Sequence, residues 1–271
     1  MNSGSNGNCY YVGNGEEAIL VDAGITCAEI EKRMGRLGLS LEKVKALFVS
    51  HEHSDHILGV PGLARKYRLS VYITNGTYAE SRFHIRKQHV HAFRPLTPVH
   101  VGQLAVTAFS KHHDAIDPHS FVICCGGITV GVFTDIGHPC DQVITHFSKC
   151  HAAFLETNYD EDRLSKGKYP AFLKSRIRSD KGHLSNIQAL ELFTKHRPPF
   201  MSHLLLSHLS KENNAPEIVD ALFSAFAGPT KIILASREKE TPVYRIEHIE
   251  FPKAEIPSPF VKKAKGQLSL F

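Results

Sequence analysis

The segment Val44–His56, VKALFVSHEHSDH, decides how the rest of the sequence is interpreted. Its first seven residues, VKALFVS, are mostly apolar and predict a buried strand. The strand is followed at once by His51, His53, Asp55 and His56. Histidine nitrogens and carboxylate oxygens are ligands for zinc, manganese and iron. A solvated polar loop is the alternative, but this spacing at the end of a strand favours a metal site.

The composition is that of an ordinary globular protein, with 42% hydrophobic and 22% charged residues in a chain of 271. No apolar run approaches the roughly 20 residues of a membrane helix. The start, MNSGSNGNCYY, lacks the layout of a signal peptide, so we expect a cytoplasmic protein. The net charge of +5 suits a polyanionic partner without requiring one. The six cysteines form no C-x-x-C pair, which argues against a zinc ribbon.

Short apolar runs alternating with helical periodicity predict a layered α/β protein. We expect strands at residues 17–22, 44–50, 71–74, 104–109, 121–125, 129–134, 152–156, 204–207 and 232–235. We expect helices between residues 22 and 38 and at 57–67, 184–196 and 217–226. One domain over residues 1–249 and a tail over 250–271, rich in Pro and Lys, account for the whole chain.

Four further motifs occur in a recognisable order around HEHSDH. Asp22 lies in LVDAG, His113 in HHDAIDP, Asp135 in FTDIG and His208 in LLLSHLS. With H-x-H-x-D-H, they resemble the ordered motifs of the metallo-β-lactamase superfamily. That resemblance implies an αββα sandwich. Relatives begin with a strand before SGSNGN, and only Met1 and Asn2 precede it here, so we expect either a misplaced start or a missing first outer strand.

The resemblance also implies two divalent metal ions, zinc or manganese. One ion would be held by His51, His53 and His113, and the other by Asp55, His56 and His208, with Asp135 bridging the two and Asp22 supporting the site. His112 is the alternative to His113. Two metal ions about 3.5–4 Å apart share a water and stabilise the attacking and leaving oxygens. Diiron flavoprotein relatives carry glutamate at the position of His53, which favours hydrolysis here.

Longer motifs resemble the YycJ/WalJ group of nucleases, near tRNase Z and PhnP-type phosphodiesterases. They are SGSNGN, HHDAIDP, LETNYD, SDKGHLSN and HLSKENN. The resemblance implies a phosphodiesterase, with exonuclease action on DNA in repair or replication as the usual assignment. The alternatives are an RNA-processing nuclease, a hydrolase of small cyclic phosphodiesters or thioesters, and a metal-loaded regulatory protein without turnover. Tyr159 replaces a histidine found in several relatives, which puts any role of that position in doubt.

His183, in the motif GHLS, is left over once the metal ligands are assigned. Phosphodiester hydrolysis needs a proton for the leaving oxygen, and histidine supplies one near neutral pH. The resemblance pairs this histidine with Glu156 in FLETN, and we count His183, Glu156 and Asp55 as the catalytic residues. The alternative is that His183 caps the helix that follows it.

The stretch Arg163–His183 carries seven Lys and Arg residues against one acid, Asp180. It reads as an insertion beside the site. Lys174, Arg176 and Arg178 are candidates for binding nucleic-acid phosphates, and Tyr169 or Phe172 for stacking on a base. A solvated basic face is the alternative.

The last five residues, QLSLF, resemble the peptide by which bacterial replication and repair proteins bind the sliding clamp. Leu268, Leu270 and Phe271 would fill an apolar pocket, with Gln267 hydrogen-bonding at its edge. The segment FPKAEIPSPFVKKAKG would act as a linker. The alternative is that LSLF packs on the folded body. A clamp partner would favour DNA over RNA as substrate.

Overall fold

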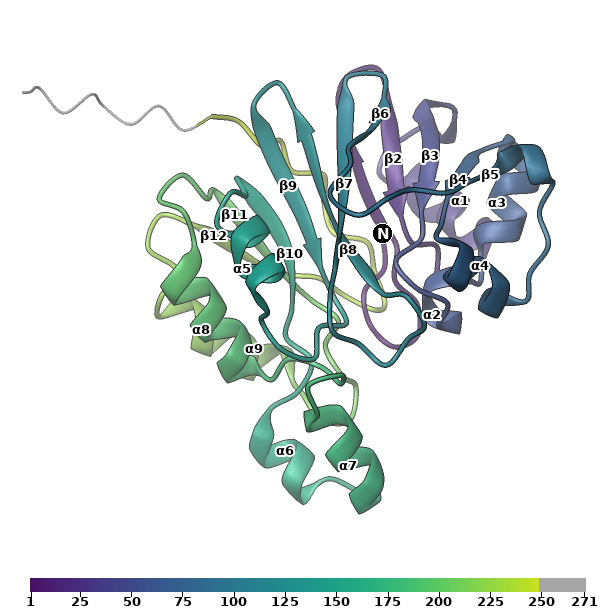
Figure 1. The fold of residues 1–271 in the computed structure, drawn as a ribbon. Helices are drawn as coiled ribbons and strands as arrows, with labels where there is room; N and C mark the ends of the chain where they lie inside the picture. The colour runs from purple at the N-terminus through teal and green to yellow at the C-terminus, as the bar shows by residue number, and fades with distance from the viewer. Residues whose placement is uncertain (249–271) are drawn as a thin grey trace, which may run out of the picture.

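The computed structural model describes residues 1–248, and in it two β-sheets pack face to face with helices on their outer faces (Figure 1). The first sheet contains β1 (Tyr10–Gly13), β2 (Ala18–Val21), β3 (Val44–Phe48), β4 (Ser70–Tyr72) and β5 (Val90–His91), in that order. The second contains β6 (Val99–Val101), β7 (Leu104–Ser110), β8 (His119–Cys125), β9 (Ile128–Phe133), β10 (Ala152–Glu156), β11 (His203–Ser207) and β12 (Lys231–Leu234). Its strand order is β12-β11-β10-β9-β8-β7-β6. The predicted αββα sandwich is confirmed.

The helices surround this sandwich. They are α1 (Cys27–Arg36), α2 (Ser54–Ile57), α3 (Val60–Tyr67), α4 (Asn75–Ser81), α5 (Asp141–Phe147), α6 (Glu161–Lys166), α7 (Ala171–Arg178), α8 (Asn186–His196) and α9 (Pro216–Ser224), with short 3₁₀ turns at Leu41–Lys43 and Lys87–His89. On one side α1 packs on α3, and α3 on β4. On the other, α5 packs on β7 and β9, and α9 on β12. None of the helices in residues 1–248 is long and apolar enough to cross a lipid bilayer.

Apolar side chains from both sheets meet in the middle of the sandwich. Val21 and Phe48 of the first sheet pack in one buried cluster with Phe121 and Val132 of the second. Two further apolar clusters lie under the helices on either side. Three apolar layers therefore hold both sheets in a fixed relation to each other, which fixes the loops at their ends.

The parallel parts of both sheets explain where the sequence motifs meet. Strands β2, β3 and β4 are parallel, as are β9, β10, β11 and β12. The carboxyl ends of parallel strands lie at the same edge of a sheet, which is where α/β proteins bind ligands. Asp22, His51, Asp135 and His208 all lie within three residues of such an end. The fold thus gathers side chains that are far apart in the sequence.

Some predicted elements differ from the structure. The helix expected at 57–67 is two helices, α2 and α3, separated near Gly59. A Cβ at Gly59 would lie 2.2 Å from the Ile25 carbonyl oxygen, so the chain needs glycine where it passes the loop after β2. Asn2 forms a single antiparallel bridge with Cys9, beside the edge strand β1. The tail prediction, including Gln267–Phe271, lies outside the described residues.

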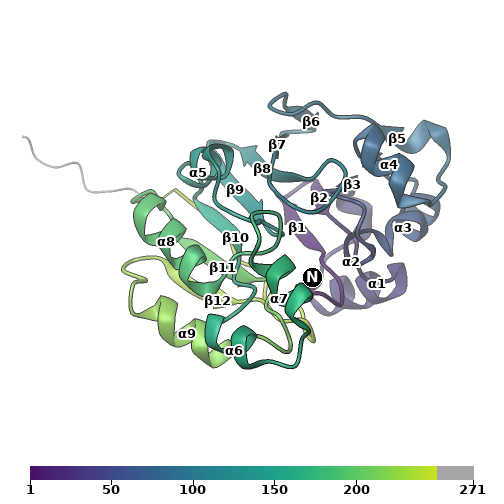
Figure 2. The same ribbon diagram turned by 60° about the horizontal axis from the view of Figure 1, so that its bottom comes forward.

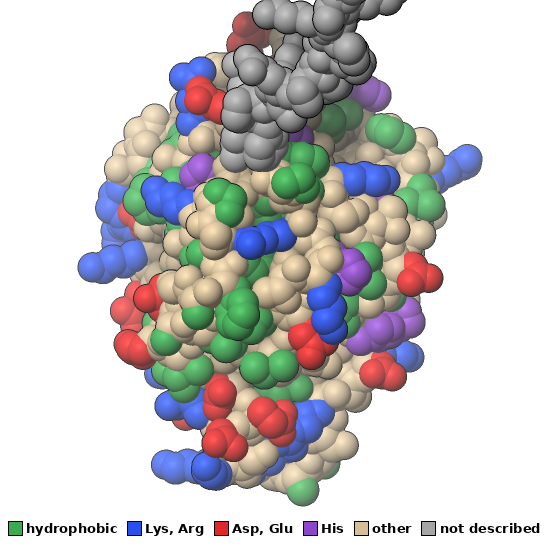
Figure 3. Space-filling model, turned by 90° about the vertical axis from the view of Figure 1, so that its left-hand side faces the viewer, with side chains coloured by type: hydrophobic (Ala, Val, Ile, Leu, Met, Phe, Trp, Pro, Cys, Tyr) green, Lys and Arg blue, Asp and Glu red, His purple; other side chains and the backbone are tan. Residues whose placement is uncertain are grey.

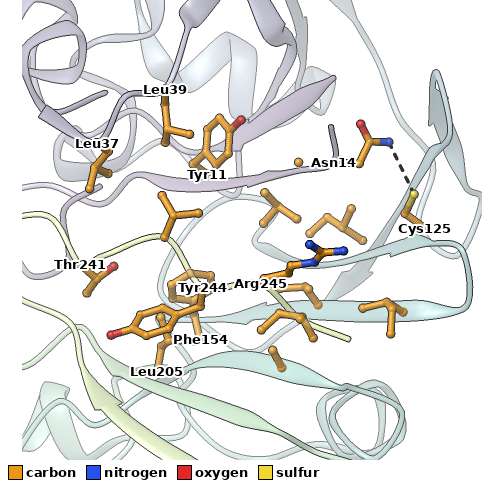
Figure 4. Close-up of a pocket in the computed structure, with 18 of the residues that line it drawn as sticks. Tyr11, Asn14, Leu37, Leu39, Cys125, Phe154, Leu205, Thr241, Tyr244 and Arg245 are labelled. Carbon is orange, nitrogen blue, oxygen red and sulfur yellow. Dashed lines mark hydrogen bonds between the residues drawn. The ribbon is translucent and has the colours of Figure 1, made fainter. Parts of the chain in front are cut away.

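A cavity of about 640 Å³ lies between the sheets beside β1 (Figure 4). Tyr11 and Leu39 face it from the side of the first sheet, and Phe154 and Leu205 from the second. The segment around Tyr244 also borders it. The cavity contains none of the predicted metal ligands, so it is separate from the site described next.

Candidate metal centre

All seven predicted metal ligands come together at the carboxyl edge of the sandwich. They fall into overlapping groups, His51 with His53 and His113; Asp55 with His56 and His208; and His51 with His56 and Asp135. Within each group the candidate ligand atoms lie within 4.8 Å of one another. Residues from four separate loops therefore present nitrogen and oxygen atoms to one small volume.

In the first group, three imidazole rings converge. His53 Nδ1 is 3.1 Å from His51 Nε2 and 3.3 Å from His113 Nε2. His112, the alternative to His113, is exposed and packs against His138, with ring centroids 4.3 Å apart. The structure therefore places His113, and not His112, with the other two histidines.

Asp135 lies between the two groups of ligands. Its Oδ1 is 3.4 Å from His208 Nδ1 and 3.8 Å from His113 Nε2, and its Oδ2 is 3.1 Å from His56 Nε2. Asp55 closes the second group, because its Oδ2 is 3.8 Å from His56 Nε2 and 3.9 Å from His208 Nε2. Asp135 is thus the carboxylate that reaches histidines of both groups.

Two atoms of this cluster are buried without a hydrogen bond of acceptable geometry. They are Asp135 Oδ2, despite its short distance to His56, and His208 Nε2. Leaving a buried polar atom unpaired costs about 1–3 kcal/mol, and more for a charged group. A divalent cation would satisfy both atoms, and the mixed nitrogen and oxygen donors suit zinc or manganese. The residues present therefore fit the metal ions that the motifs imply.

Asp22 holds one of the candidate ligands from behind. Its Oδ2 lies 2.8 Å from His56 Nδ1, and its Oδ1 accepts a 2.7 Å hydrogen bond from the Ser50 backbone amide. The carboxylate is completely buried. This contact turns His56 Nε2 toward Asp135, the usual way in which a carboxylate orients a metal-binding histidine.

Sequence reasoning missed Asn8 and Lys111. Asn8 Nδ2 lies 3.0 Å from His56 Nε2 and 3.4 Å from Asp55 Oδ2. Lys111 is buried, and its Nζ donates to the Thr134 carbonyl at 2.6 Å, directly before Asp135. SGSNGN contains Asn8, so a polar residue at the site could have been inferred from that motif. Nothing in the sequence marks Lys111, because a lysine usually stays in water.

His183 and Glu156 form a pair beside the cluster. His183 Nδ1 lies 2.8 Å from Glu156 Oε1, and His208 Nδ1 lies 2.7 Å from the same oxygen. Glu156 Oε2 accepts backbone hydrogen bonds from Ile136 and Leu184. The His183 side chain is 22% exposed, whereas Glu156 is completely buried. The pair thus presents one accessible imidazole, held in place by a fixed carboxylate.

The alternative assignment of His183, as a helix cap, is wrong. Helix α8 is capped by Ser185, whose hydroxyl accepts from the Gln188 amide while the Gln188 side chain accepts from the Ser185 amide. Tyr159, by contrast, is buried, forms a backbone β-bridge with Ser185 and does not line the pocket of the candidate ligands.

The carboxylates and imidazoles of the centre shift one another's pKa values. Burial opposes protonation of His56, but the carboxylates of Asp135, Asp22 and Asp55 outweigh it and raise its pKa to about 10. Burial alone would raise the pKa of Asp135, yet His208 and His56 hold it well below its usual range. Burial likewise opposes ionisation of Glu156, but the neighbouring imidazoles lower its pKa to about 2. The carboxylates are therefore ionised and draw positive charge into the site, a demand that divalent cations also meet.

Three residues of the site have left-handed backbone. Asp22, Asp135 and His208 have φ values of 59°, 55° and 57°, although none is glycine. Such conformations are uncommon outside glycine and persist where surrounding contacts enforce them. Each of the three follows the end of a strand and turns its side chain toward the cluster. The strained backbone conformations therefore occur at the site itself.

The basic insertion borders the same site. A pocket of about 370 Å³ is lined by candidate ligands and by Tyr169, Leu173, Arg176 and Ile177. Figure 2 shows α7 lying in front of the sheet edges. Arg176 pairs with Asp114.

The other predicted phosphate-binding residues of the insertion also make contacts within the protein. Arg178 Nε donates to Glu161 Oε1 at 2.7 Å, and Lys174 Nζ to the Ser165 carbonyl at 2.8 Å. On the face in Figure 3, basic and acidic side chains are interspersed, also at the lower end. That face does not present a purely basic surface.

The fold and the site define a class of protein. Residues 3–173 match the sequence pattern of the Metallo-beta-lactamase superfamily. The chain belongs to this superfamily, and it is a metal-dependent hydrolase.

Individual proteins within the superfamily are also similar to this chain. The chain is 33% identical over 227 residues to the exodeoxyribonuclease YycJ of Bacillus anthracis, covering 80% of this chain and 83% of the relative. Two solved structures share the fold. The metallo-beta-lactamase fold protein YhfI from Bacillus subtilis has a TM-score of 0.68 at 19% identity, covering 87% of this chain and 94% of that one. The short form of human tRNase Z has a TM-score of 0.63 at 15% identity, with 91% and 97% covered.

Proposed function

We propose that the chain binds two divalent ions, zinc or manganese, and hydrolyses phosphodiester bonds of nucleic acid, with DNA as the substrate. One ion would be held by His51, His53 and His113, the other by Asp55, His56 and His208, and Asp135 would bridge them. The observation that carries the proposal is the position of Asp135, whose carboxylate reaches histidines of both groups. DNA is preferred because a relative that is 33% identical over 80% of the chain is named an exodeoxyribonuclease.

Two divalent ions, when bound, supply activation of a water and stabilise the charge that develops on the phosphate oxygens. The chain supplies the rest. His183 is the accessible imidazole at the edge of the pocket, and we propose that it gives a proton to the leaving oxygen. Glu156 holds the His183 ring through Nδ1, which leaves Nε2 free to face the substrate. Asp55, which is 24% exposed and lines the pocket, would help to hold its ion and would lie near the attacking water.

The experiment is a nuclease panel with the purified full chain. End-labelled single- and double-stranded DNA and the matching RNA are incubated with zinc, with manganese, and with a chelator. We expect release of mononucleotides from DNA that the chelator abolishes. Faster cleavage of RNA would make the chain an RNA-processing nuclease, and turnover of small phosphodiesters or thioesters alone would make it a small-molecule hydrolase. No turnover with any metal would overturn the proposed activity.

We further propose that residues 1–249 form the hydrolase domain and that 250–271 recruit it to DNA. The residues Gln267, Leu268, Leu270 and Phe271 would bind the bacterial sliding clamp. The sequence QLSLF and the Pro- and Lys-rich stretch before it support this proposal. Weak binding by a short peptide becomes effective when both proteins are on the same DNA, because tethering raises the local concentration.

A further inference from the structure

Apolar and aromatic side chains of the insertion line the catalytic pocket together with Arg176. Leu173 and Ile177 are four residues apart on α7 and therefore lie on one side of the helix. Tyr169 lies just ahead of the helix, next to its N-cap Pro170. All three line the pocket that contains His53, Asp55 and His183. We call Tyr169, Leu173 and Ile177 the apolar wall.

Of the charged residues of α7, Arg176 also lines the pocket, beside this wall. The guanidinium groups of Arg176 and Arg178 are paired with Asp114 and Glu161, and Lys174 reaches a backbone carbonyl of α6. Phe172 is 75% exposed and does not line the pocket. The helix thus presents Leu173, Ile177 and the paired Arg176 to the pocket, and its exposed aromatic residue Phe172 lies outside the pocket.

The apolar wall is joined directly to the proton-donating histidine. The His183 backbone amide donates a 2.9 Å hydrogen bond to the Ile177 carbonyl. Gly182 packs so closely on the end of α7 that a Cβ there would lie 2.1 Å from the Ile177 carbonyl oxygen. His113 Nδ1 lies 3.1 Å from the Gly182 carbonyl on the other side. These contacts set the wall at a fixed position relative to both His183 and the metal ligands.

We propose that the apolar wall binds the base of the nucleotide whose phosphate is cleaved, with Tyr169 stacking on the base and Leu173 packing against it. The inference rests on the proposed nuclease function. A phosphodiester bound at the metal centre would place its own nucleoside beside the pocket wall, and aromatic side chains stack on bases of any sequence. In a duplex, neighbouring bases cover each base face. The wall therefore accepts a terminal nucleotide that has separated from its neighbours, which suits cleavage from an end.

The test removes the base from the substrate and the ring from the enzyme. Two labelled oligonucleotides are compared, one normal and one with an abasic sugar at the terminal cleavable position. For the wild type we expect kcat/KM to be about 5- to 100-fold lower on the abasic substrate, the range that stacking of one base supports. On the normal substrate, Tyr169→Ala should have a kcat/KM lower than that of the wild type by a similar factor. On the abasic substrate, the variant and the wild type should differ little, because the two changes remove the same contact.

Three further variants make the result specific. Tyr169→Phe keeps the ring and should behave as the wild type. Phe172→Ala, on the same helix but outside the pocket, should keep the full preference for the normal substrate. If Tyr169→Ala fails to fold, Leu173→Asn provides the same comparison.

The outcomes distinguish a failure of the proposed function from a failure of the base-binding inference. If the wild type cleaves no nucleic acid, the proposed function fails and this inference fails with it. If the wild type cleaves both oligonucleotides equally, the nuclease stands and the apolar wall does not bind a base. An equal loss by Tyr169→Ala on both substrates would make Tyr169 a structural residue and would also overturn the inference.

Discussion

His183 is held between an immobile carboxylate and the end of α7, and its imidazole is the accessible group of the pair. We expect His183→Ala to keep both metal ions and to slow hydrolysis about 10²–10⁴-fold, the usual loss on removing a general acid. A substrate that releases p-nitrophenolate needs no proton on the leaving oxygen, so it should regain much of the rate. Loss of metal from the variant would show instead that His183 is a ligand.

A second prediction for a single residue concerns Asp22. Within residues 1–248, the Asp22 carboxylate contacts the metal centre through its hydrogen bonds with His56 and Ser50. Asp22→Ala should therefore weaken metal binding about 10- to 100-fold while the chain stays folded. Metal titration followed by circular dichroism measures both properties. Asp141→Ala, an exposed acid in the first turn of α5, is the matched control and should bind metal normally. Unchanged affinity in Asp22→Ala would contradict the supporting role.

The convergence of the candidate ligands was predictable from the sequence because each of their motifs follows a recognisable apolar strand. The choice between His112 and His113 was not, although its physical basis is simple. Beyond β7 the chain remains extended, and Lys111, His112 and His113 are buried, exposed and buried in turn. Only one of two adjacent histidines can face inward. Lys111 itself could not be predicted, because its burial depends on contacts with distant strands.

Some strands and helices were predicted from the sequence and others were not, for similar reasons. Strands such as β3, VKALF, and β11, HLLLS, are mostly apolar and were identified from the pattern alone. The edge strand β1, YYVG, is too short to signal a strand, and α5, α6 and α7 have eight residues or fewer. The ion pairs of the insertion join α7 to α6 and to the loop of Asp114. A charge count along the sequence does not reveal such pairing.

A further prediction concerns the basic residues of the insertion. Replacing Lys174, Arg176 and Arg178 with Ala should weaken binding of long DNA and flatten its salt dependence, because fewer counterions are released. Turnover of a small phosphodiester should change little. Binding measured from low to high salt, beside the small-substrate rate, tests this. A similar loss on both substrates would show that the contacts to Glu161 and Asp114 matter for structure rather than for DNA.

For the whole molecule, the tail is expected to act independently of the catalytic body. A variant ending at Gly266 should lose binding to the purified sliding clamp and should still cleave short free DNA at the wild-type rate. Binding assays with the full chain and the shortened chain test this. A scrambled version of the last five residues, with unchanged composition, is the control. No clamp binding by the full chain, or equal binding by both, would remove the tail's support for a DNA-directed role.

The most direct test of the account is the number of metal ions bound per chain, measured together with DNA cleavage. Asp135 takes a left-handed backbone, so Asp135→Gly is compared with Asp135→Ala to separate backbone strain from loss of the carboxylate. We predict that the wild type binds two divalent ions and releases nucleotides from DNA. Both variants should lose at least one ion and essentially all turnover. Two bound ions with full activity in either variant would contradict the bridging role of Asp135 and the two-metal centre built on it.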